Sequence, residues 1–147
     1  MIDLGLSNDT CVPELLVSAL SENFSIQFPE SPIEYLVIED QPKKFKRNRE
    51  LQLIIETYLL CSYNIKQIIR ISPIKVKNFL GLPCTGDHDK NKTMMVELIK
   101  NSETLFMGGT EYSNHEADCV GLFNQFLSNH KRISQLTNTF VLEESVI

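Results

Sequence analysis

Two short apolar runs on either side of an amphipathic stretch constrain the fold of this chain more than any other feature. The runs, Ile33 to Glu39 and Ile65 to Ile71, are rich in β-branched and aromatic residues, which is typical of strands. Between them, within residues 47–61, apolar side chains recur at helical spacing: Leu51, Ile54, Ile55, Tyr58 and Leu59. Strands joined by one helix are parallel with a right-handed crossover, so the pattern predicts an α/β fold.

The rest of the chain favours helices. We expect them over residues 13–24, 74–80, 92–101 and 116–129. Gly81 is expected to be a C-cap, residues 82–91 a polar loop and residues 107–110 a flexible turn. Residues 133–147 fit either a helix or an edge strand. Because 147 residues are enough to bury one core, we expect a single domain over residues 1–147.

The charge balance limits the partners. A net charge of -5 excludes a surface that is basic all round, so binding to nucleic acid requires a local patch. The segment 43–49 supplies one, with five cations: Lys43, Lys44, Lys46, Arg47 and Arg49. No apolar run is long enough to span a bilayer, and no basic segment precedes an apolar leader. We therefore expect a soluble, intracellular protein without a membrane partner.

The cysteines allow two interpretations. Cys11, Cys61, Cys84 and Cys119 show no CxxC pairing, which favours reduced thiols. The alternative is a zinc site, because Cys84 with His88 and His115 with Cys119 form two mirrored pairs of soft ligands. A gap of three residues between Cys and His is not a typical zinc spacing.

Acidic residues stand where the first predicted strand ends. Glu39 and Asp40 follow the apolar run directly. In parallel sheets, functional side chains gather at the carboxyl ends of the strands, so these carboxylates are candidates for a site. The alternative is a strand that ends in solvated acids.

A second candidate is the segment SNHEADC. His115 and Asp118 are three residues apart and share one face of a helix. The alternative is Asn114 as an N-cap with acids in the first turn, which would explain Glu116 and could explain Asp118 but does not explain the imidazole. Imidazole and carboxylate suit Mg²⁺ or Mn²⁺, especially if another carboxylate approaches from a strand end.

The order of these motifs resembles a known family. VIEDQP (residues 37–42), a basic stretch containing asparagine, an apolar helix, IKQIIRISP (65–73) and HEAD (115–118) follow one another. The series is similar to the RuvC-like branch of the RNase H-type nucleases, and most of all to the Holliday junction resolvases of poxviruses and other large DNA viruses. Those enzymes carry IExQ at the end of the fourth strand and [HD]xxD at the start of the last core helix. The resemblance covers about Pro13 to Asn129.

The resemblance implies a fold and an activity. The fold would be RNase H-like, with parallel strands, helices packed on the sheet and a reduced N-terminal β-hairpin region. The activity would be metal-dependent cleavage of four-way DNA junctions during viral or organellar recombination and replication, by a homodimer, in the cytoplasm if the protein is viral. Two metal ions about 4 Å apart would activate water and stabilise the leaving oxygen.

The resemblance also implies roles for individual residues. Glu39 and Asp118 would bind Mg²⁺ or Mn²⁺, and His115 would be a ligand or orient the attacking water. Gln41 and Asn48 would hydrogen-bond phosphate or water. The phosphates of the DNA backbone would be held by the five cations of segment 43–49 and by two later lysines, Lys90 and Lys92.

Asp3 is the candidate for the carboxylate that the family carries on its first strand. Asp3, Gly5 and Asn8 match the family's DxGxxN-like spacing, but only two residues precede Asp3 and a central strand takes about five or six. The other interpretation, which we favour, matches residues 1–11 to the segment before the first helix, with the first three strands absent. The chain would then be incomplete, a decayed copy or completed by a partner. We expect Glu39 and Asp118 to approach each other without Asp3.

Three functions follow from these observations. The first is a junction-resolving nuclease. The second is a catalytically inactive protein that binds branched DNA on the same scaffold, because a missing first-strand carboxylate would weaken metal binding. The third is an interaction domain stabilised by zinc.

Overall fold

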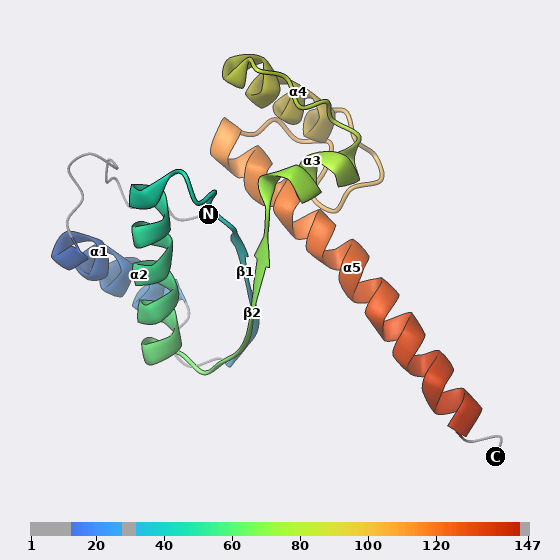
Figure 1. The fold of residues 1–147 in the computed structure, drawn as a ribbon, viewed down its shortest axis with the longest axis horizontal. Helices are drawn as coiled ribbons and strands as arrows, with labels where there is room; N and C mark the ends of the chain where they lie inside the picture. Colours follow the sequence, from blue (N-terminus) through green and yellow to red (C-terminus); the bar gives the residue numbers. More distant parts are fainter. Residues whose placement is uncertain (1–12, 28–31, 145–147) are drawn as a thin grey trace. The chain divides into compact units, whose positions relative to one another are not determined.

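The computed structural model describes residues 13–27 and 32–144, and it describes side chains for residues 13–24 and 32–130. Along the chain the elements are α1 (Pro13–Gln27), β1 (Ile33–Glu39), α2 (Lys46–Ser62), β2 (Ile65–Ile71), α3 (Pro73–Leu80), α4 (His88–Lys100) and α5 (Asn114–Glu144) (Figure 1). The predicted α/β class is confirmed, whereas the RNase H-like topology stays a prediction. The chain divides into two compact units, Met1–Pro73 and Ile74–Ile147. The single domain stays a prediction as well.

The two strands form a parallel pair, as the strand–helix–strand pattern predicted. Ile33 lies opposite Ile65 and Glu39 opposite Ile71, and the backbone N–H of Asp40 donates to the carbonyl of Ile71 at 2.9 Å. Both strands begin and end at the residues expected from the sequence. Glu39 therefore stands at the carboxyl end of β1, where the sequence placed it.

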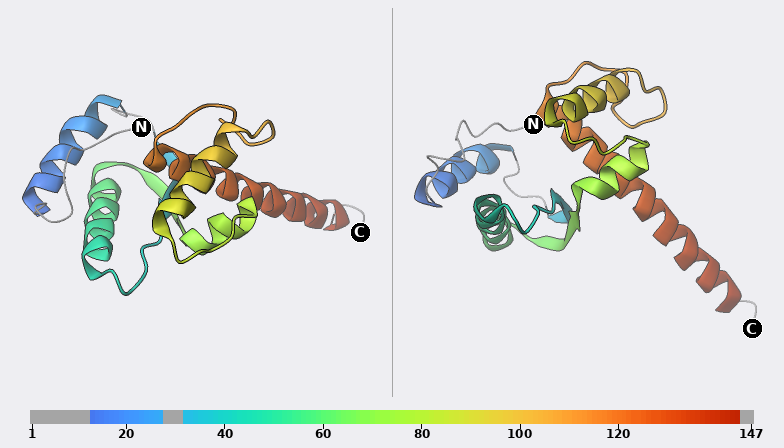
Figure 2. Two further views of the ribbon diagram at one scale, coloured as in Figure 1. Left: turned by 90° about the horizontal axis from the view of Figure 1, so that it is seen from above. Right: turned by 45° about the horizontal axis from the view of Figure 1, so that its top comes forward.

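The core of the first unit lies between α1 and α2, which are adjacent in Figures 1 and 2. Leu16 and Leu20 of α1 are buried. They pack against five partly buried side chains: Phe24, Leu51, Ile54, Ile55 and Tyr58. The apolar stripe predicted for residues 47–61 is thus the side of α2 that meets α1.

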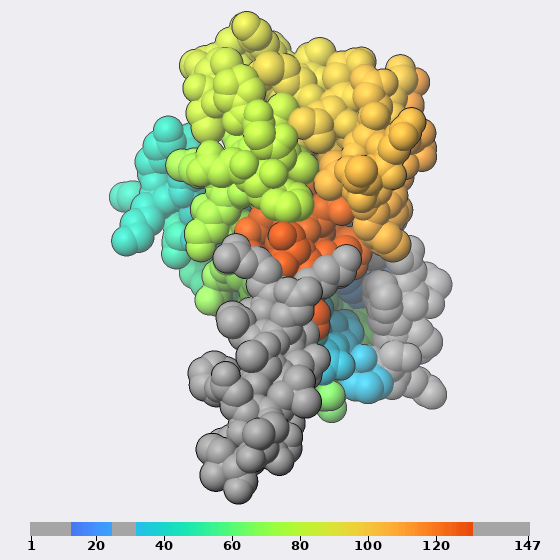
Figure 3. All heavy atoms as spheres, turned by 90° about the vertical axis from the view of Figure 1, so that its right-hand side faces the viewer, coloured from blue at the N-terminus to red at the C-terminus, as the bar shows by residue number. Residues whose placement is uncertain are grey.

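The second unit is helical, and its helices meet at Gly121 of α5. A Cβ atom at this position would lie 3.2 Å from Val76 Cγ1 and Leu80 Cδ1 of α3, and 3.4 Å from Met95 Sδ of α4. The missing side chain therefore lets α3 and α4 pack closely against α5. In Figure 3 the atoms of this unit, yellow-green to orange-red, form one continuous body.

The connection between α4 and α5 is held by a buried amide. Asn124 of α5 accepts a hydrogen bond from the backbone N–H of Phe106 at 2.8 Å and donates one to its carbonyl at 2.9 Å. The turn predicted at residues 107–110 is present, since Met107 and Gly109 adopt φ values of 61° and 79°. Gly81, at φ 69°, follows α3 as the predicted C-cap.

The start of α4 differs from the sequence-based prediction. The polar loop predicted over residues 82–91 is wrong from His88 onward, because the helix begins there and not at Lys92. Asp87 is the N-cap, and its carboxylate accepts from the backbone N–H of Lys90 at 3.1 Å. This capping bond satisfies one of the free N–H groups of the first turn and stabilises the start of the helix in this polar segment.

The start of α5 also needs a correction, since Ser113 and not Asn114 caps the helix. Ser113 Oγ accepts from the N–H of Glu116 at 3.3 Å, and Glu116 Oε2 accepts from the N–H of Ser113 at 2.9 Å. This reciprocal pair is a capping box. The helix continues to Glu144, so residues 133–144 are helical and not an edge strand.

No helix in the described part of the chain combines the length and the apolar character that a bilayer crossing needs.

Candidate functional site

Three polar residues of the first unit meet at the carboxyl end of β1. Gln41 Nε2 donates to Glu39 Oε1 at 3.1 Å, and Asn48 Nδ2 donates to Gln41 Oε1 at 3.4 Å. They border a pocket of about 310 Å³, whose lining residues are Ile38, Glu39, Gln41, Asn48, Leu51, Gln52 and Ile55. The carboxylate, the amide two residues later and the asparagine of the basic stretch are therefore brought together, as the motif order suggested.

A buried polar network extends from this pocket into the interface between α2 and the sheet. The backbone N–H of Gln41 donates to Gln52 Oε1 at 2.9 Å, and Gln52 Nε2 donates to Glu56 Oε1 at 2.9 Å. Arg70 of β2 completes it with two bonds to the Glu56 carboxylate, from Nε at 2.9 Å and from Nη2 at 2.6 Å. The end of β1 is thus connected to the neighbouring strand through two side chains of α2.

Glu56 remains charged in this setting. The residue is 3% exposed, and its side-chain hydrogen bonds with Arg70 lower its pKa more than burial raises it. A carboxylate held by a bidentate guanidinium is among the stronger pairings available to a buried acid.

The sequence motifs did not indicate three residues of this network: Gln52, Glu56 and Arg70. The sequence did contain an indication, because Gln52 and Glu56 are four residues apart and therefore share one face of the predicted helix, beside its apolar stripe. Arg70 likewise interrupts an apolar strand. Of the three, Gln52 and Glu56 are buried, and buried polar side chains require hydrogen-bond partners elsewhere in the fold.

The basic segment borders the same loop. Lys43, Lys44 and Lys46 are exposed, with Lys44 Nζ 5.0 Å from the centre of the Phe45 ring. Arg49 already has partners within the protein: its Nη1 donates to the carbonyl of Gln41 at 3.0 Å and lies 3.7 Å from Asp40 Oδ1. These interactions place Arg49 beside the end of β1.

The remaining cations of the basic set lie elsewhere. Arg47 Nη1 is 3.5 Å from Glu50 Oε2 on the exposed side of α2. Lys90 and Lys92 belong to α4 in the second unit. The roles of all seven basic candidates in binding nucleic acid stay predictions.

In the second unit, Asp118 lies among basic side chains from three helices. The carboxylate is partly buried, and burial raises its pKa, while the neighbouring basic side chains act in the opposite direction: His115, Lys92, Lys77 and His88. The packing of Gly121 against Val76 and Met95 agrees with this grouping. Val76 is the neighbour of Lys77 in the chain. Lys92 lies about one helical turn before Met95, and Asp118 lies about one turn before Gly121, so the three charged residues are near the same contact.

His115 and Asp118 are therefore neighbours on α5, as predicted. Glu116 is turned away to the capping box with Ser113. Glu39 belongs to the first unit and Asp118 to the second, so their mutual approach stays a prediction. Asp3 lies outside the described residues.

Glu39 and Asp118 offer oxygen ligands of the kind that Mg²⁺ binds. Among the described side chains, those of residues 13–24 and 32–130, no three His, Cys, Asp or Glu residues are grouped so that they could hold a metal ion. Mg²⁺ usually keeps several waters and binds one or two carboxylates together with substrate phosphates, so Glu39 or Asp118 suits it as a partial ligand set. The zinc alternative gains no support from the same residues. Cys61 and Cys84 are exposed free thiols, and Cys11 is outside the described residues.

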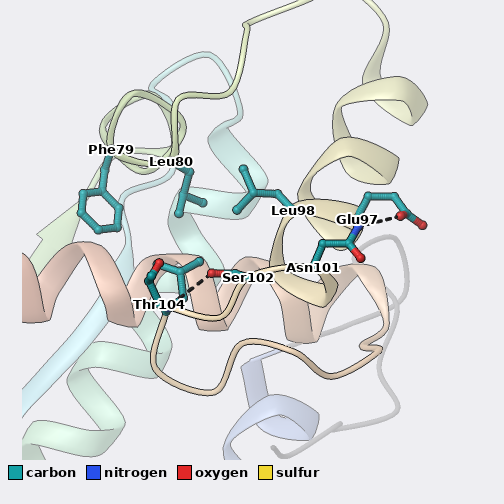
Figure 4. A pocket seen from close by; sticks show the side chains of 8 residues that line it. Phe79, Leu80, Glu97, Leu98, Asn101, Ser102 and Thr104 are labelled. Atoms are coloured by element: carbon teal, nitrogen blue, oxygen red, sulfur yellow. Dashed lines mark hydrogen bonds between the residues drawn. The ribbon is translucent and has the colours of Figure 1, made fainter.

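Another pocket, of about 700 Å³, lies in the second unit (Figure 4). Its walls are Phe79, Leu80, Glu97, Leu98, Asn101, Ser102, Thr104 and Leu105. The only ionisable side chain among them is Glu97, whose Oε2 accepts from Asn101 Nδ2 at 3.3 Å. Because none of the sequence-predicted site residues lines it, we place the candidate site elsewhere.

Comparison with known proteins gave no match: no family model, no curated protein and no solved structure is similar to this chain at a significant level.

Proposed function

We propose that this protein is a metal-dependent endonuclease that cleaves four-way DNA junctions, on an RNase H-like scaffold. The observation that carries the proposal is the cluster at the end of β1. Glu39 is hydrogen-bonded by Gln41, Gln41 is hydrogen-bonded by Asn48, and the pocket they line opens beside a loop with exposed lysines. Carboxylate next to cations is the combination that a metal-dependent nuclease needs, because the acid binds metal and the cations hold phosphates.

Each residue has a proposed role. Glu39 and Asp118 would hold Mg²⁺ or Mn²⁺, with Asp3 as a third candidate ligand, and the bound metal would supply a nucleophilic water and charge neutralisation. His115 would be a further ligand or orient the water. Gln41 would fix the carboxylate of Glu39. The backbone phosphates would be held by the basic set, which is Lys43, Lys44, Lys46, Arg47, Arg49, Lys90 and Lys92.

The test is cleavage of a synthetic four-way junction in Mg²⁺, with a linear duplex of the same sequence as the substrate control. We expect wild-type protein to cut the junction and Glu39→Gln to lose the activity, since the amide cannot replace a charged ligand. Glu34→Gln is the matched control, because Glu34 is on the same strand but is 64% exposed and 3.8 Å from Lys66 Nζ. Equal cleavage by wild type and Glu39→Gln would show that the site is assigned wrongly.

A second function is favoured by one observation, the lack of a three-ligand metal group in the described part of the chain. In that case the protein binds branched DNA without cutting it. Gel-shift binding to the junction, with no nicking in either Mg²⁺ or Mn²⁺, would establish this alternative. Nicking that depends on metal would exclude it.

A further inference from the structure

The loop that follows β1 is held through the backbone of Gln41. Its N–H donates to Gln52 Oε1 at 2.9 Å, and its carbonyl accepts from Arg49 Nη1 at 3.0 Å. Arg49 and Gln52 are three residues apart on α2 and project from the same side. Both polar groups of this residue's backbone are thus fixed by one helix face, while the Gln41 side chain reaches back to Glu39.

Gln52 performs this function only in one orientation of its amide. A rotation of the amide by 180° would present an NH₂ group to the N–H of Gln41, and two donors cannot bond. Glu56 selects the correct orientation, because an ionised carboxylate only accepts and therefore requires the Gln52 NH₂ group. The orientation of Gln52 depends on Glu56 staying charged.

Arg70 keeps Glu56 charged and connects the network to the sheet. Its two hydrogen bonds to Glu56 come from β2, where Arg70 lies opposite Ile38, the residue before Glu39. The hydrogen bonds therefore run without a break from Arg70 of β2 through Glu56 and Gln52 of α2 to Gln41 in the loop, and from the Gln41 side chain to Glu39 at the end of β1. Glu56 is buried, whereas the Arg70 side chain is half exposed, so the pair fixes a buried carboxylate of α2 to a residue of β2. Removing Arg70 would leave that carboxylate buried without its charged partner, which is strongly unfavourable.

We propose that Arg70, Glu56 and Gln52 form a positioning relay that sets the loop after β1 and, through Gln41, the carboxylate of Glu39. None of the three relay residues is a proposed metal ligand or a proposed phosphate-binding residue, so they act through Gln41. The catalytic consequence rests on the proposed nuclease function. The geometric consequence, a fixed Gln41 backbone, does not.

The first measurement reads the relay without any activity. Hydrogen exchange of the Gln41 backbone amide, followed by NMR, reports whether its bond to Gln52 is formed. We expect protection in the wild type, loss of protection in Gln52→Met, which keeps the side-chain length but removes both bonds, and partial loss in Glu56→Gln, whose amide can face Gln52 with either end. Gln67→Met and Glu34→Gln are the matched controls, because both positions are exposed on the strands.

The second measurement separates positioning from a merely structural role. In junction cleavage we expect Gln52→Met to lower kcat about 10- to 100-fold, the range that a displacement of about 1 Å can cause. The dissociation constant for the junction, measured in Ca²⁺, should stay close to wild type. Glu56→Gln should be intermediate, and the two controls should behave as wild type.

The outcomes are distinguishable. If the wild type cuts no junction, the proposed function fails, and Gln41 protection alone decides on the relay. If Gln41 stays protected in both Gln52→Met and Glu56→Gln, the relay does not exist. If protection is lost but kcat is unchanged, the loop is held without consequence for catalysis, and the positioning role is overturned. If Gln52→Met does not fold, Glu56→Gln is judged by the same two measurements.

Discussion

Glu56 and Asp118 are both removed from solvent to some extent, but their pKa values change in opposite directions. Burial raises the pKa of both, and only Glu56 has hydrogen bonds from a guanidinium that reverse the effect. Asp118 has positive charges around it, yet burial still outweighs them. The cost of burying the Glu56 charge is thus offset by Arg70. The cost of burying the Asp118 charge is only partly offset, as is common for residues that bind a ligand.

Removing the charge of Glu56 should destabilise the protein in a pH-dependent way. Its pKa is lowered from 4.5 in the folded state, so its contribution is present above that value and is lost as the pH falls through the folded pKa. We expect Glu56→Gln to lower the free energy of unfolding by about 1.5–3 kcal/mol at neutral pH, the range for hydrogen bonds to charged groups. The difference from wild type should shrink in acid. Urea unfolding at neutral and acid pH measures it, and a difference independent of pH would contradict the assignment.

Asp118 should show the opposite sign. Because its pKa is raised from 3.8 in the folded state, ionisation costs stability as the pH rises through the window above that value. We therefore expect Asp118→Asn to unfold at a higher temperature than wild type at neutral pH without divalent metal. A lower midpoint for Asp118→Asn would show that the ionised carboxylate is stabilising.

At the level of elements, the first turn of α2 is unfavourable by itself. Phe45 precedes the helix without a side-chain hydrogen bond to it, and no acidic residue stands in the first turn. Lys46, Arg47 and Arg49 instead place positive charge at the positive end of the helix dipole. A helix start that opposes its own dipole is consistent with cations kept for binding phosphate.

The unfavourable charge at the start of α2 predicts that a substitution which stabilises the helix will weaken DNA binding. We expect Lys46→Glu to raise the free energy of unfolding by about 0.3–1 kcal/mol, because it reverses an unfavourable charge at the helix start. The same change should weaken junction binding, since it places an acid beside the phosphates. Urea unfolding and gel-shift titration of one preparation test both effects. A variant that is more stable and binds DNA as well as wild type would remove Lys46 from the proposed interface.

For the molecule as a whole, the net charge of -5 means that attraction to DNA must be local. Each phosphate that a cation neutralises releases counterions and contributes about 0.9 to the slope of log K against log salt concentration. The slope therefore measures how many phosphates the basic set neutralises, independently of catalysis.

Replacing Lys43, Lys44 and Lys46 with glutamine should reduce that slope by about one for each phosphate that the variant no longer neutralises. The matched control replaces three other lysines, Lys66, Lys75 and Lys100, and so changes the net charge equally. Junction affinity is measured over a salt series for both triple variants. Equal slopes for the two variants would show that the proteins differ from wild type only in overall charge.

The sequence by itself determined the local elements. The bounds of β1 and β2 follow from β-branched runs, and Gly81 ends α3 because glycine adopts a positive φ readily. The placement of Glu39 at a strand end followed from the same runs. These features depend on neighbours along the chain, which the sequence contains. The start of α4 was missed because the polar residues around Asp87 fit a loop as well as a helix cap.

Only the tertiary structure decided which polar residues meet. Arg70 and Glu56 are 14 residues apart and come from different elements, so neither spacing nor composition pairs them. Their pairing depends on how α2 lies against β2, a tertiary arrangement in which the apolar stripe of α2 packs against Leu16 and Leu20 of α1. The same physics explains Asp118, because a pKa is determined by burial and by charges from three helices, and the sequence reports neither.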